Sequence, residues 1–235
     1  MKGKILSIYA IADLHLSFDV SKPMNIFGEN WTNHEEKIKS DWELKVKEND
    51  LVILPGDFSW ATNLKETYKD FQYLEKLPGK KLLLKGNHDY WWTTLTSMRK
   101  YLKQNNFEKI DFIYNNSYFY NNYIITGTRG WTNLDKDEKI LNRENIRLEL
   151  SLQDGINKYG KDKEIIVVMH YPPFSSSKTD DTQLIKTMKK YNVTKCIYGH
   201  LHGQSHKEAV EGNINNIEYK LVSCDYTNFK LLKII

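Results

Sequence analysis

Five short apolar runs in this chain are each followed closely by a histidine or an acidic residue. The runs span residues 5–12, 51–54, 81–84, 165–169 and 196–198. Short runs of aliphatic, often β-branched residues are typical of strands that are buried on both faces of a sheet. The pattern therefore predicts five strands, each followed directly by a polar side chain.

Segments with helical spacing of their hydrophobic residues separate these runs. They span 33–49, 63–76, 93–106, 135–158 and 180–191. Asn63 and Glu66 have the spacing of a capping box, which marks the start of the second helix. Strands and helices alternate as far as about residue 200, and this alternation predicts an α/β fold.

The pattern changes after residue 200. Residues 206–211, 217–223 and 229–235 read as strands, and turn residues at 212–213 and 225–228 separate them. We therefore expect antiparallel C-terminal strands. The asparagine pairs at 115–116 and 121–122 mark a β-hairpin. Because no linker or repeat interrupts the chain, residues 1–235 are expected to form one domain without a separate cap.

Composition narrows the class of protein. The 235 residues are 40% hydrophobic, and the net charge of +4 comes from dispersed lysines, which does not favour nucleic acid as a partner. No stretch approaches the roughly 18 apolar residues of a membrane span, and no signal peptide is expected. Cys196 and Cys224 show no metal-binding spacing, so we expect reduced, buried thiols in a cytoplasmic protein.

Five of the seven histidines belong to motifs at the predicted strand ends. The motifs are Asp13-Leu14-His15, Gly56-Asp57, Gly86-Asn87-His88-Asp89, Met169-His170 and Gly199-His200-Leu201-His202. In open α/β sheets ligands bind beyond the carboxyl ends of the strands, so one sheet would gather these groups on one rim. Residues two apart in an extended strand point to the same side. Asp13 and His15 could thus face one ion together, as could His200 and His202.

The donor types predict the kind of metal. Imidazole nitrogens combined with carboxylate and amide oxygens suit manganese, iron, zinc or cobalt better than magnesium or calcium. The motifs contain too many ligands for one four-coordinate ion. The sequence therefore predicts a site for two metal ions, with one aspartate bridging them.

In this order, the motifs resemble those of the calcineurin-like metallophosphoesterases, over residues 13–202. The resemblance implies a sandwich of two mixed β-sheets flanked by helices and a dinuclear centre, with manganese and iron favoured. It implies one ion at Asp13, His15 and His202, a second at Asn87, His170 and His200, and Asp57 bridging them. His88 would protonate the leaving group, and Asp89 would orient or charge its imidazole.

This resemblance implies a bacterial-type, metal-dependent phosphohydrolase. It would hydrolyse a small phosphomonoester or phosphodiester by attack of metal-bound hydroxide. The second motif continues Phe58-Ser59-Trp60 instead of supplying the arginine of protein Ser/Thr phosphatases, which argues against phosphoprotein substrates. Two alternatives are a nuclease acting on short or single-stranded nucleic acid and a non-catalytic interaction scaffold. The oligomeric state is not predicted.

Several residues outside the metal motifs have two interpretations. Arg129, after the apolar run 123–125, could bind a substrate phosphate or carboxylate, or be an ordinary surface or salt-bridged arginine. Four tryptophans in the motif loops could stack on a substrate or simply pack the loops. They are Trp60, Trp91, Trp92 and Trp131. His34 and His206 are expected to be structural or exposed.

Overall fold

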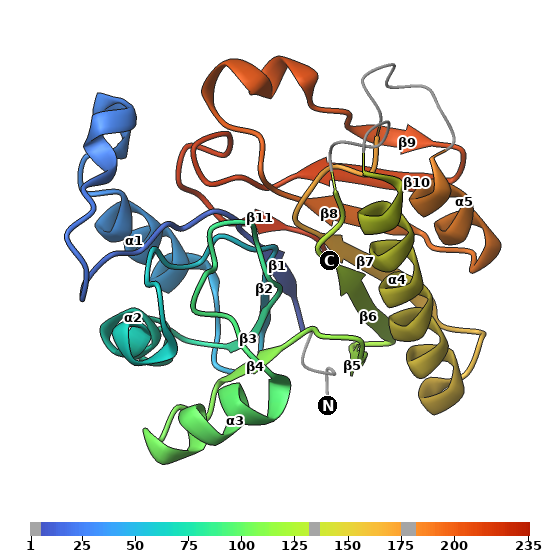
Figure 1. Cartoon of the computed structure of the whole chain (residues 1–235), viewed down its shortest axis with the longest axis horizontal. Coiled ribbons are helices and arrows are strands. Elements are labelled where there is room, and N and C mark those ends of the chain that lie inside the picture. The colour runs from blue at the N-terminus through green and yellow to red at the C-terminus, as the bar shows by residue number, and fades with distance from the viewer. Residues whose placement is uncertain (1–5, 132–136, 175–181) are drawn as a thin grey trace.

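Two β-sheets packed face to face form the centre of the molecule, and helices cover the outer face of each (Figure 1). The computed structural model describes residues 6–131, 137–174 and 182–235. The first sheet has the strand order β11-β1-β2-β3-β4, and the second has the order β5-β6-β7-β8-β10-β9. Helices α1, α2 and α3 lie beside the first sheet, and α4 and α5 beside the second. This arrangement confirms the expected α/β sandwich of two mixed sheets.

The strands are parallel at the centre of each sheet, and antiparallel pairs lie at one edge of the first sheet and at both edges of the second. The first sheet contains β1 (Ile8–Ala10), β2 (Leu51–Leu54), β3 (Lys80–Leu83), β4 (Ile110–Phe112) and β11 (Leu232–Lys233). The second contains β5 (Tyr118–Tyr120), β6 (Tyr123–Thr128), β7 (Glu164–Met169), β8 (Lys195–Tyr198), β9 (Gly212–Ile214) and β10 (Ile217–Leu221). Strand β11 pairs antiparallel with β1, β5 with β6, and β9 with β10.

The helices lie between these strands in the chain. The α-helices are α1 (His34–Lys45), α2 (Tyr68–Lys76), α3 (Leu95–Gln104), α4 (Glu138–Tyr159) and α5 (Gln183–Lys190). Short 3-10 helices span Met24–Phe27, Glu29–Trp31, Leu64–Thr67 and Gly203–Glu208. No helix within the described ranges is long and apolar enough to cross a membrane.

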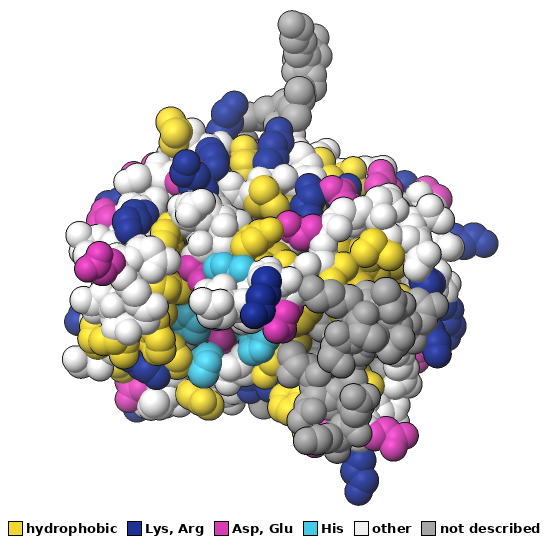
Figure 2. All heavy atoms as spheres, turned by 90° about the horizontal axis from the view of Figure 1, so that it is seen from above, with side chains coloured by type: hydrophobic (Ala, Val, Ile, Leu, Met, Phe, Trp, Pro, Cys, Tyr) yellow, Lys and Arg dark blue, Asp and Glu magenta, His cyan; other side chains and the backbone are white. Residues whose placement is uncertain are grey.

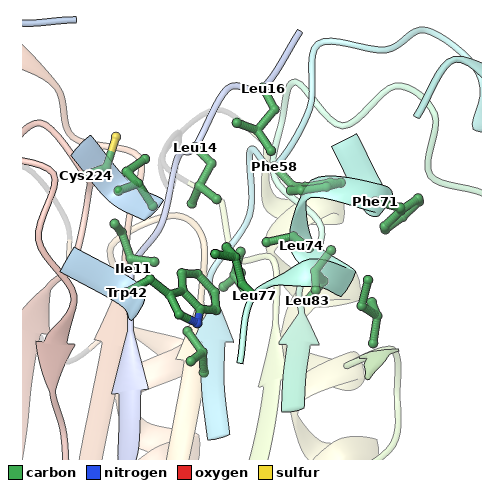
Figure 3. Close-up of a cluster of buried hydrophobic side chains, with 14 of the residues drawn as sticks. Ile11, Leu14, Leu16, Trp42, Phe58, Phe71, Leu74, Leu77, Leu83 and Cys224 are labelled. Atoms are coloured by element: carbon green, nitrogen blue, oxygen red, sulfur yellow. The ribbon is translucent and has the colours of Figure 1, made fainter. Parts of the chain in front are cut away.

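Apolar side chains fill three layers, one between the sheets and one under each group of helices. Ile53 and Ile166 meet in the layer between the sheets. Trp42 and Phe71, from α1 and α2, lie in the layer outside the first sheet (Figure 3). Trp42 is fully buried and satisfies its indole nitrogen by donating to the carbonyl of Pro78 at 2.9 Å.

A short seam joins the two sheets. Ala12, just beyond β1, donates its N–H to the carbonyl of Val222 at 2.7 Å and accepts from the N–H of Cys224 at 3.0 Å. Val222 follows β10 of the second sheet, so the seam pairs the strand ends of one sheet with those of the other. It brings the polar residues after β1, β2 and β3 close to those after β7 and β8. The expectation that one sheet would gather all five motifs is wrong, because these strands divide between two sheets.

The C-terminal part contains antiparallel strand pairs, as predicted, but the strands differ in position from the prediction. Residues 206–208 lie in a 3-10 helix, and Gly212 and Asn213 are part of β9 instead of a turn. The Tyr198 hydroxyl bonds both the N–H and the carbonyl of Val210, so this segment satisfies its backbone without joining a sheet. Strand β10 runs parallel to β8, and of the predicted strand 229–235 only 232–233 is regular.

Other local predictions hold with shifted boundaries. Helix α1 ends at Lys45 instead of residue 49, because the chain extends at Val46 and the Asp50 carboxylate accepts from the N–H of Lys47. Asn63 caps the next helix as predicted. The predicted positions 5, 135 and 180 lie outside the described residues. Cys196 and Cys224 are buried free thiols.

The predicted hairpin joins β5 and β6. Its turn lies at Asn121 and Asn122, whose φ angles are 48° and 70°. Asparagine tolerates this left-handed region better than most residues, so the pair is a recognisable hairpin turn.

Candidate metal centre

Sharp turns place the polar residues just beyond the strand ends. Four site residues have left-handed backbones: Asp13 (φ 62°), His15 (47°), Asp57 (50°) and His200 (73°). This region is rare for residues other than glycine and collects at functional sites. The expectation that Asp13 and His15, or His200 and His202, face one ion along an extended strand is therefore wrong in its geometry. The turned backbone still brings Asp13 and His15 together.

The first group of candidate ligands is Asp13, His15 and His202. Their ligand atoms lie within 4.8 Å of one another. His202 Nε2 is 3.6 Å from Asp13 Oδ1, and the Asp13 side chain is fully buried. His15 Nδ1 and His202 Nε2 are buried without a hydrogen-bond partner among the described residues. Buried polar atoms rarely lack partners, so these nitrogens fit a bound ion.

The second group lies on the other side of Asp57. Asp13, Asp57 and His170 also have ligand atoms within 4.8 Å of one another. Asn87 Oδ1 is 2.6 Å from His170 Nε2 and 3.0 Å from His200 Nδ1.

Asp57 is placed between the two groups. Its Oδ2 is 3.6 Å from His170 Nε2 and 3.8 Å from His15 Nε2. Its other oxygen accepts from the N–H of His88 at 2.8 Å. The structure thus brings all seven predicted ligands together, while the ion that each would hold stays a prediction.

The protonation states of the imidazoles suit metal binding. Burial lowers the pKa of His15 and of His170 below the usual value, and burial together with His170 lowers that of His200 to about 3. These three rings are therefore neutral at neutral pH, which is the form that ligates metals.

The pKa values of two other groups near the centre, His202 and Asp57, are raised. Burial opposes the charged form of His202, but the carboxylates of Asp13 and Asp225 outweigh it and raise the pKa to about 10. Burial and the neighbouring Asp13 raise the pKa of Asp57 to about 8. Two buried carboxylates this close repel each other, and bound cations would relieve that repulsion.

Further hydrogen bonds orient two of the rings. His170 Nδ1 donates to the carbonyl of Pro55 at 3.0 Å, which leaves Nε2 directed at Asn87 and Asp57. His202 Nδ1 lies 2.8 Å from Asp225 Oδ1. Such partners fix the tautomer of a metal-binding histidine. Asp225 was not predicted, because it lies beyond β10, where Glu218 and Lys220 interrupt the apolar pattern that identified the other strand ends.

Two motif glycines leave room for the carboxylates. A Cβ on Gly86 would lie 2.0 Å from Asp57 Oδ1, and one on Gly199 would lie 2.6 Å from Asp13 Oδ2. These positions require glycine because the acidic side chains approach the backbone itself.

His88 and Asp89 do not form the pair that was expected. The Asp89 carboxylate is buried and accepts from the N–H groups of Asp57, Phe58 and Gly86 at 2.7 to 3.0 Å. It also accepts from the indole of Trp91 at 3.0 Å. His88 Nδ1 has no hydrogen-bond partner among the described residues. Asp89 therefore fixes the loop that carries Asp57 and does not orient the His88 ring, because its oxygens are already engaged by backbone donors.

A cavity of about 400 Å³ opens beside the centre. It is lined by His15, Met24, Phe27, Asn30, Trp31, Trp60, His88, His202, Gly203 and Asp225. Figure 2 shows histidine side chains gathered on one face, bordered by hydrophobic side chains. The cavity thus combines candidate metal ligands with an aromatic wall.

The loop tryptophans have different surroundings. Trp60 stacks on the ring of His15 at 4.6 Å between centroids and lines the cavity. Trp91 is buried against Phe71, so it packs the loop. Trp131 lies at 5.0 Å from the guanidinium of Arg129. Trp91 therefore packs its loop, while stacking of Trp60 on a substrate stays a prediction.

The two histidines outside the motifs are structural. His34 is buried and bonds the carbonyl of Leu14 at 2.9 Å through Nε2. His206 Nε2 lies 3.1 Å from Asp225 Oδ2, on the side chain that also holds His202. Neither belongs to the candidate ligand groups.

The two-sheet sandwich with buried Asp and His side chains at its seam is the architecture of a metallophosphoesterase. The sequence model of the calcineurin-like phosphoesterase family matches residues 6–204, and the chain belongs to this family. No curated protein sequence matches the chain significantly.

Solved structures share the fold at low sequence identity. A protein of unknown function from Aquifex aeolicus, AQ665, is 19% identical with a TM-score of 0.51, over 97% of this chain and 96% of that one. The TT1561 protein of Thermus thermophilus is 12% identical with a TM-score of 0.57, over 98% of both chains. The phosphopantetheinyl hydrolase of Mycobacterium tuberculosis is 13% identical with a TM-score of 0.53, over 92% of this chain and 88% of that one. At these identities the likeness concerns the fold.

Proposed function

We propose that this protein is a metal-dependent phosphoesterase that hydrolyses a small phosphomonoester or phosphodiester. The observation that carries the proposal is the convergence of seven candidate ligands beside a cavity that also contains His88. Membership of the calcineurin-like phosphoesterase family supports the reaction class. One structural neighbour is described as a hydrolase, which agrees with it.

Two ions would be bound on either side of Asp57. Asp13, His15 and His202 would hold one ion, and Asn87, His170 and His200 the other. Such ions, with manganese and iron favoured over zinc and cobalt, would lower the pKa of bound water and neutralise charge on the phosphoryl oxygens. The protein contributes imidazoles in fixed orientations, of which those of His15, His170 and His200 are neutral, and buried carboxylates that would bind the ions.

His88 would donate a proton to the oxygen of the leaving group. Its ring lies on the cavity wall, 4.5 Å from the Trp60 ring between centroids. Burial, His170 and Lys22 lower the pKa of His88. A phosphate dianion bound beside the ring would raise that pKa again, since an opposite charge favours the protonated form. Substrate binding would thus supply the acid when it is needed.

The organic part of the ester would lie against the aromatic wall of the cavity. Met24, Trp31 and Trp60 are buried but border the opening, and Phe27 is 58% exposed. Aromatic and thioether side chains bind flat, apolar groups well. This wall favours an ester whose alcohol has apolar surface.

The proposal is tested with protein reconstituted with manganese. p-Nitrophenyl phosphate, bis(p-nitrophenyl) phosphate and a labelled DNA single strand are compared, each with metal and with chelator. We expect hydrolysis of at least one small ester, abolished by chelator and restored by metal. Activity that survives chelation would contradict the dinuclear mechanism, and inactivity with two ions bound would favour the scaffold alternative.

Replacing His88 tests the proton donor. His88→Ala should retain both metal ions but lose about 100-fold or more in turnover, because general acid catalysis typically contributes that much. The loss should be smallest for p-nitrophenyl phosphate, whose leaving group needs little protonation. Metal content by elemental analysis is measured in parallel, and loss of an ion from this variant would contradict the assignment.

A further inference from the structure

A second cavity, of about 360 Å³, opens at the carboxyl ends of β3 and β6. Its polar lining comes from the residues just after β3, the start of α3, the end of β6 and the first half of α4. Three of the four arginines of the chain line it: Arg129, Arg143 and Arg147. Because most of the positive charge of the chain comes from lysine, its composition does not predict three arginines around one cavity.

The charges around this cavity do not balance. Among the described residues that line the cavity, Lys85 and the three arginines give four positive charges and Glu144 gives one negative charge, a net charge of +3. Glu144 is fully buried. One of its oxygens accepts from the Thr128 hydroxyl at 2.7 Å, and the other accepts from Arg147 at 2.8 Å. Glu144 thus anchors the arginines of α4 and leaves most of the positive charge uncompensated.

Arg129 has an unused donor. Its Nε is buried without a hydrogen-bond partner among the described residues, and its guanidinium lies 5.0 Å from the ring of Trp131. A buried donor without a partner is rare in folded proteins. A guanidinium presents a planar fork of donors that matches the oxygens of a phosphate. Arg129 is therefore prepared for an anion.

The cavity is connected to the candidate metal centre through the protein. The carbonyl of Arg129 accepts from the N–H of His170 at 3.1 Å. The ring of Tyr171 lies 4.2 Å from that of His200 and 5.4 Å from that of Trp131. Lys85 lies two positions before Asn87 in the same loop. The cavity is therefore adjacent to the candidate ligands His170 and His200.

We propose that this cavity binds a second phosphate group of the substrate, so that the substrate class is a small compound with two phosphate groups. One phosphate reacts at the metal centre, and the other is held by Arg129, Lys85 and the arginines of α4. This inference rests on the proposed phosphoesterase function. A free phosphate ion has the same chemistry as the second group, and the experiments below separate the two sources.

Equilibrium dialysis with radiolabelled inorganic phosphate tests the cavity itself. We expect metal-loaded wild type to bind phosphate at a site that Arg129→Gln weakens at least 10-fold, since a hydrogen bond to a charged group contributes about that much. Arg99→Gln is the matched control, because Arg99 is the remaining arginine and pairs with Asp111 away from the cavity lining. Phosphate binding that Arg129→Gln leaves unchanged would overturn the proposal.

Kinetics test the link to the substrate. The ratio of kcat/KM for adenosine 3′,5′-bisphosphate to that for adenosine 5′-monophosphate should exceed 10 in wild type and fall at least 10-fold in Arg129→Gln, but not in Arg99→Gln. Equal rates for the two nucleotides in wild type, with Arg129-dependent phosphate binding intact, would identify a free-anion site and overturn the substrate assignment. Absence of all ester hydrolysis with two ions bound would instead contradict the proposed phosphoesterase function, while the dialysis result would still decide whether the cavity binds phosphate.

Discussion

Asp225 holds the His202 ring in the orientation that metal binding needs. Its carboxylate meets His202 Nδ1 at 2.8 Å, accepts from the N–H of Gly203 at 3.2 Å and contacts His206. Nε2 of His202 is thereby left facing Asp13. Asp225 is a positioning residue, because it acts through His202.

Replacing Asp225 should weaken metal binding, although Asp225 is not itself a candidate metal ligand. Asp225→Ala is expected to lower the affinity for manganese by about 10- to 100-fold, as removal of such partners usually does. Asp225→Asn should lose less, because its amide oxygen still accepts from Nδ1. Calorimetric titration measures both, with the exposed Asp162→Asn as control. Equal losses in the Asn and Ala variants would contradict the orienting role.

Protonation of Asp70, which is not a candidate metal ligand, makes the free energy of unfolding depend on pH. It is fully buried and accepts from the N–H of Phe18 and from the hydroxyl of Ser59. Burial raises the pKa of Asp70 to about 6, from 3.8. The folded state therefore favours the protonated acid. The stability that this proton contributes is present below about pH 4 and is lost as the pH rises towards 6.

Asp70→Asn should remove this dependence. The free energy of unfolding of wild type relative to the variant should fall by about 2 to 3 kcal/mol between pH 4 and pH 7, since each pKa unit corresponds to about 1.4 kcal/mol. Urea unfolding in chelator measures it, so that metal binding does not contribute. Parallel pH curves for the two proteins would refute the expectation.

Some individual residues could be predicted from sequence and others could not. The seven candidate ligands were identifiable because each follows an apolar strand run. The hydrogen bonds of Asp89 to the backbone could not be predicted, because the order Asn87-His88-Asp89 does not reveal in which direction each side chain points. The sequence did not identify Lys85, Arg143 and Arg147 as residues that line a cavity. Arg143 and Arg147 lie on the surface of a helix, where no sequence pattern distinguishes an arginine that lines a cavity from one that faces solvent.

At the scale of elements, the strand-to-loop turns determine where the carboxylates lie. Gly86 follows β3 at a point where its backbone touches Asp57, which follows β2. The two parallel strands are paired in register, so their exits are side by side. Any added side chain at Gly86 must displace the Asp57 carboxylate.

Gly86→Ala is expected to abolish binding of at least one metal ion, because the new Cβ would meet Asp57 Oδ1 at 2.0 Å. Gly212→Ala is the control: its φ is +91°, so alanine is strained there, but a Cβ would meet no atom within 4 Å. Elemental analysis and thermal unfolding are measured for both. The control should lose stability and retain metal, and a Gly86→Ala variant with two ions would contradict the packing argument.

The elements before residue 200 were more predictable than those after it. Long periodic segments such as α4 and α3 have clear amphipathic spacing, and β7 is a continuous apolar run. The segment 206–211 resembles a strand in composition, but the long-range bond of the Tyr198 hydroxyl to Val210 decides its conformation. No local pattern contains that information.

At the scale of the molecule, the metal centre lies at the seam between two sheets. Asp13, Asp57 and Asn87 come from the first sheet, and His170, His200 and His202 from the second. The ions would thus connect the halves of the sandwich. The family resemblance implied two sheets, whereas the strand patterns alone predicted one. A buried parallel strand has the same apolar sequence pattern whether the strands form one sheet or two.

Metal removal should therefore lower the stability of the whole protein. With manganese at about 1,000 times its dissociation constant, binding adds about 4 kcal/mol, so chelation should lower Tm by about 10 °C. Differential scanning calorimetry measures the shift, and Asp57→Asn should reduce it. Equal Tm values with metal and with chelator would show that the ions do not connect the two sheets.

Strand β11 pairs Ala10 with Leu232 and Tyr9 with Lys233, which places the last strand of the structure beside its first. During synthesis, β1 has no neighbour on that side until residues 232–233 have emerged from the ribosome. A bare strand edge is a template for pairing with other chains. Pairing of β11 with β1 therefore protects this edge of the nascent protein from self-association, and we expect chains that lack β11 to aggregate as they are made.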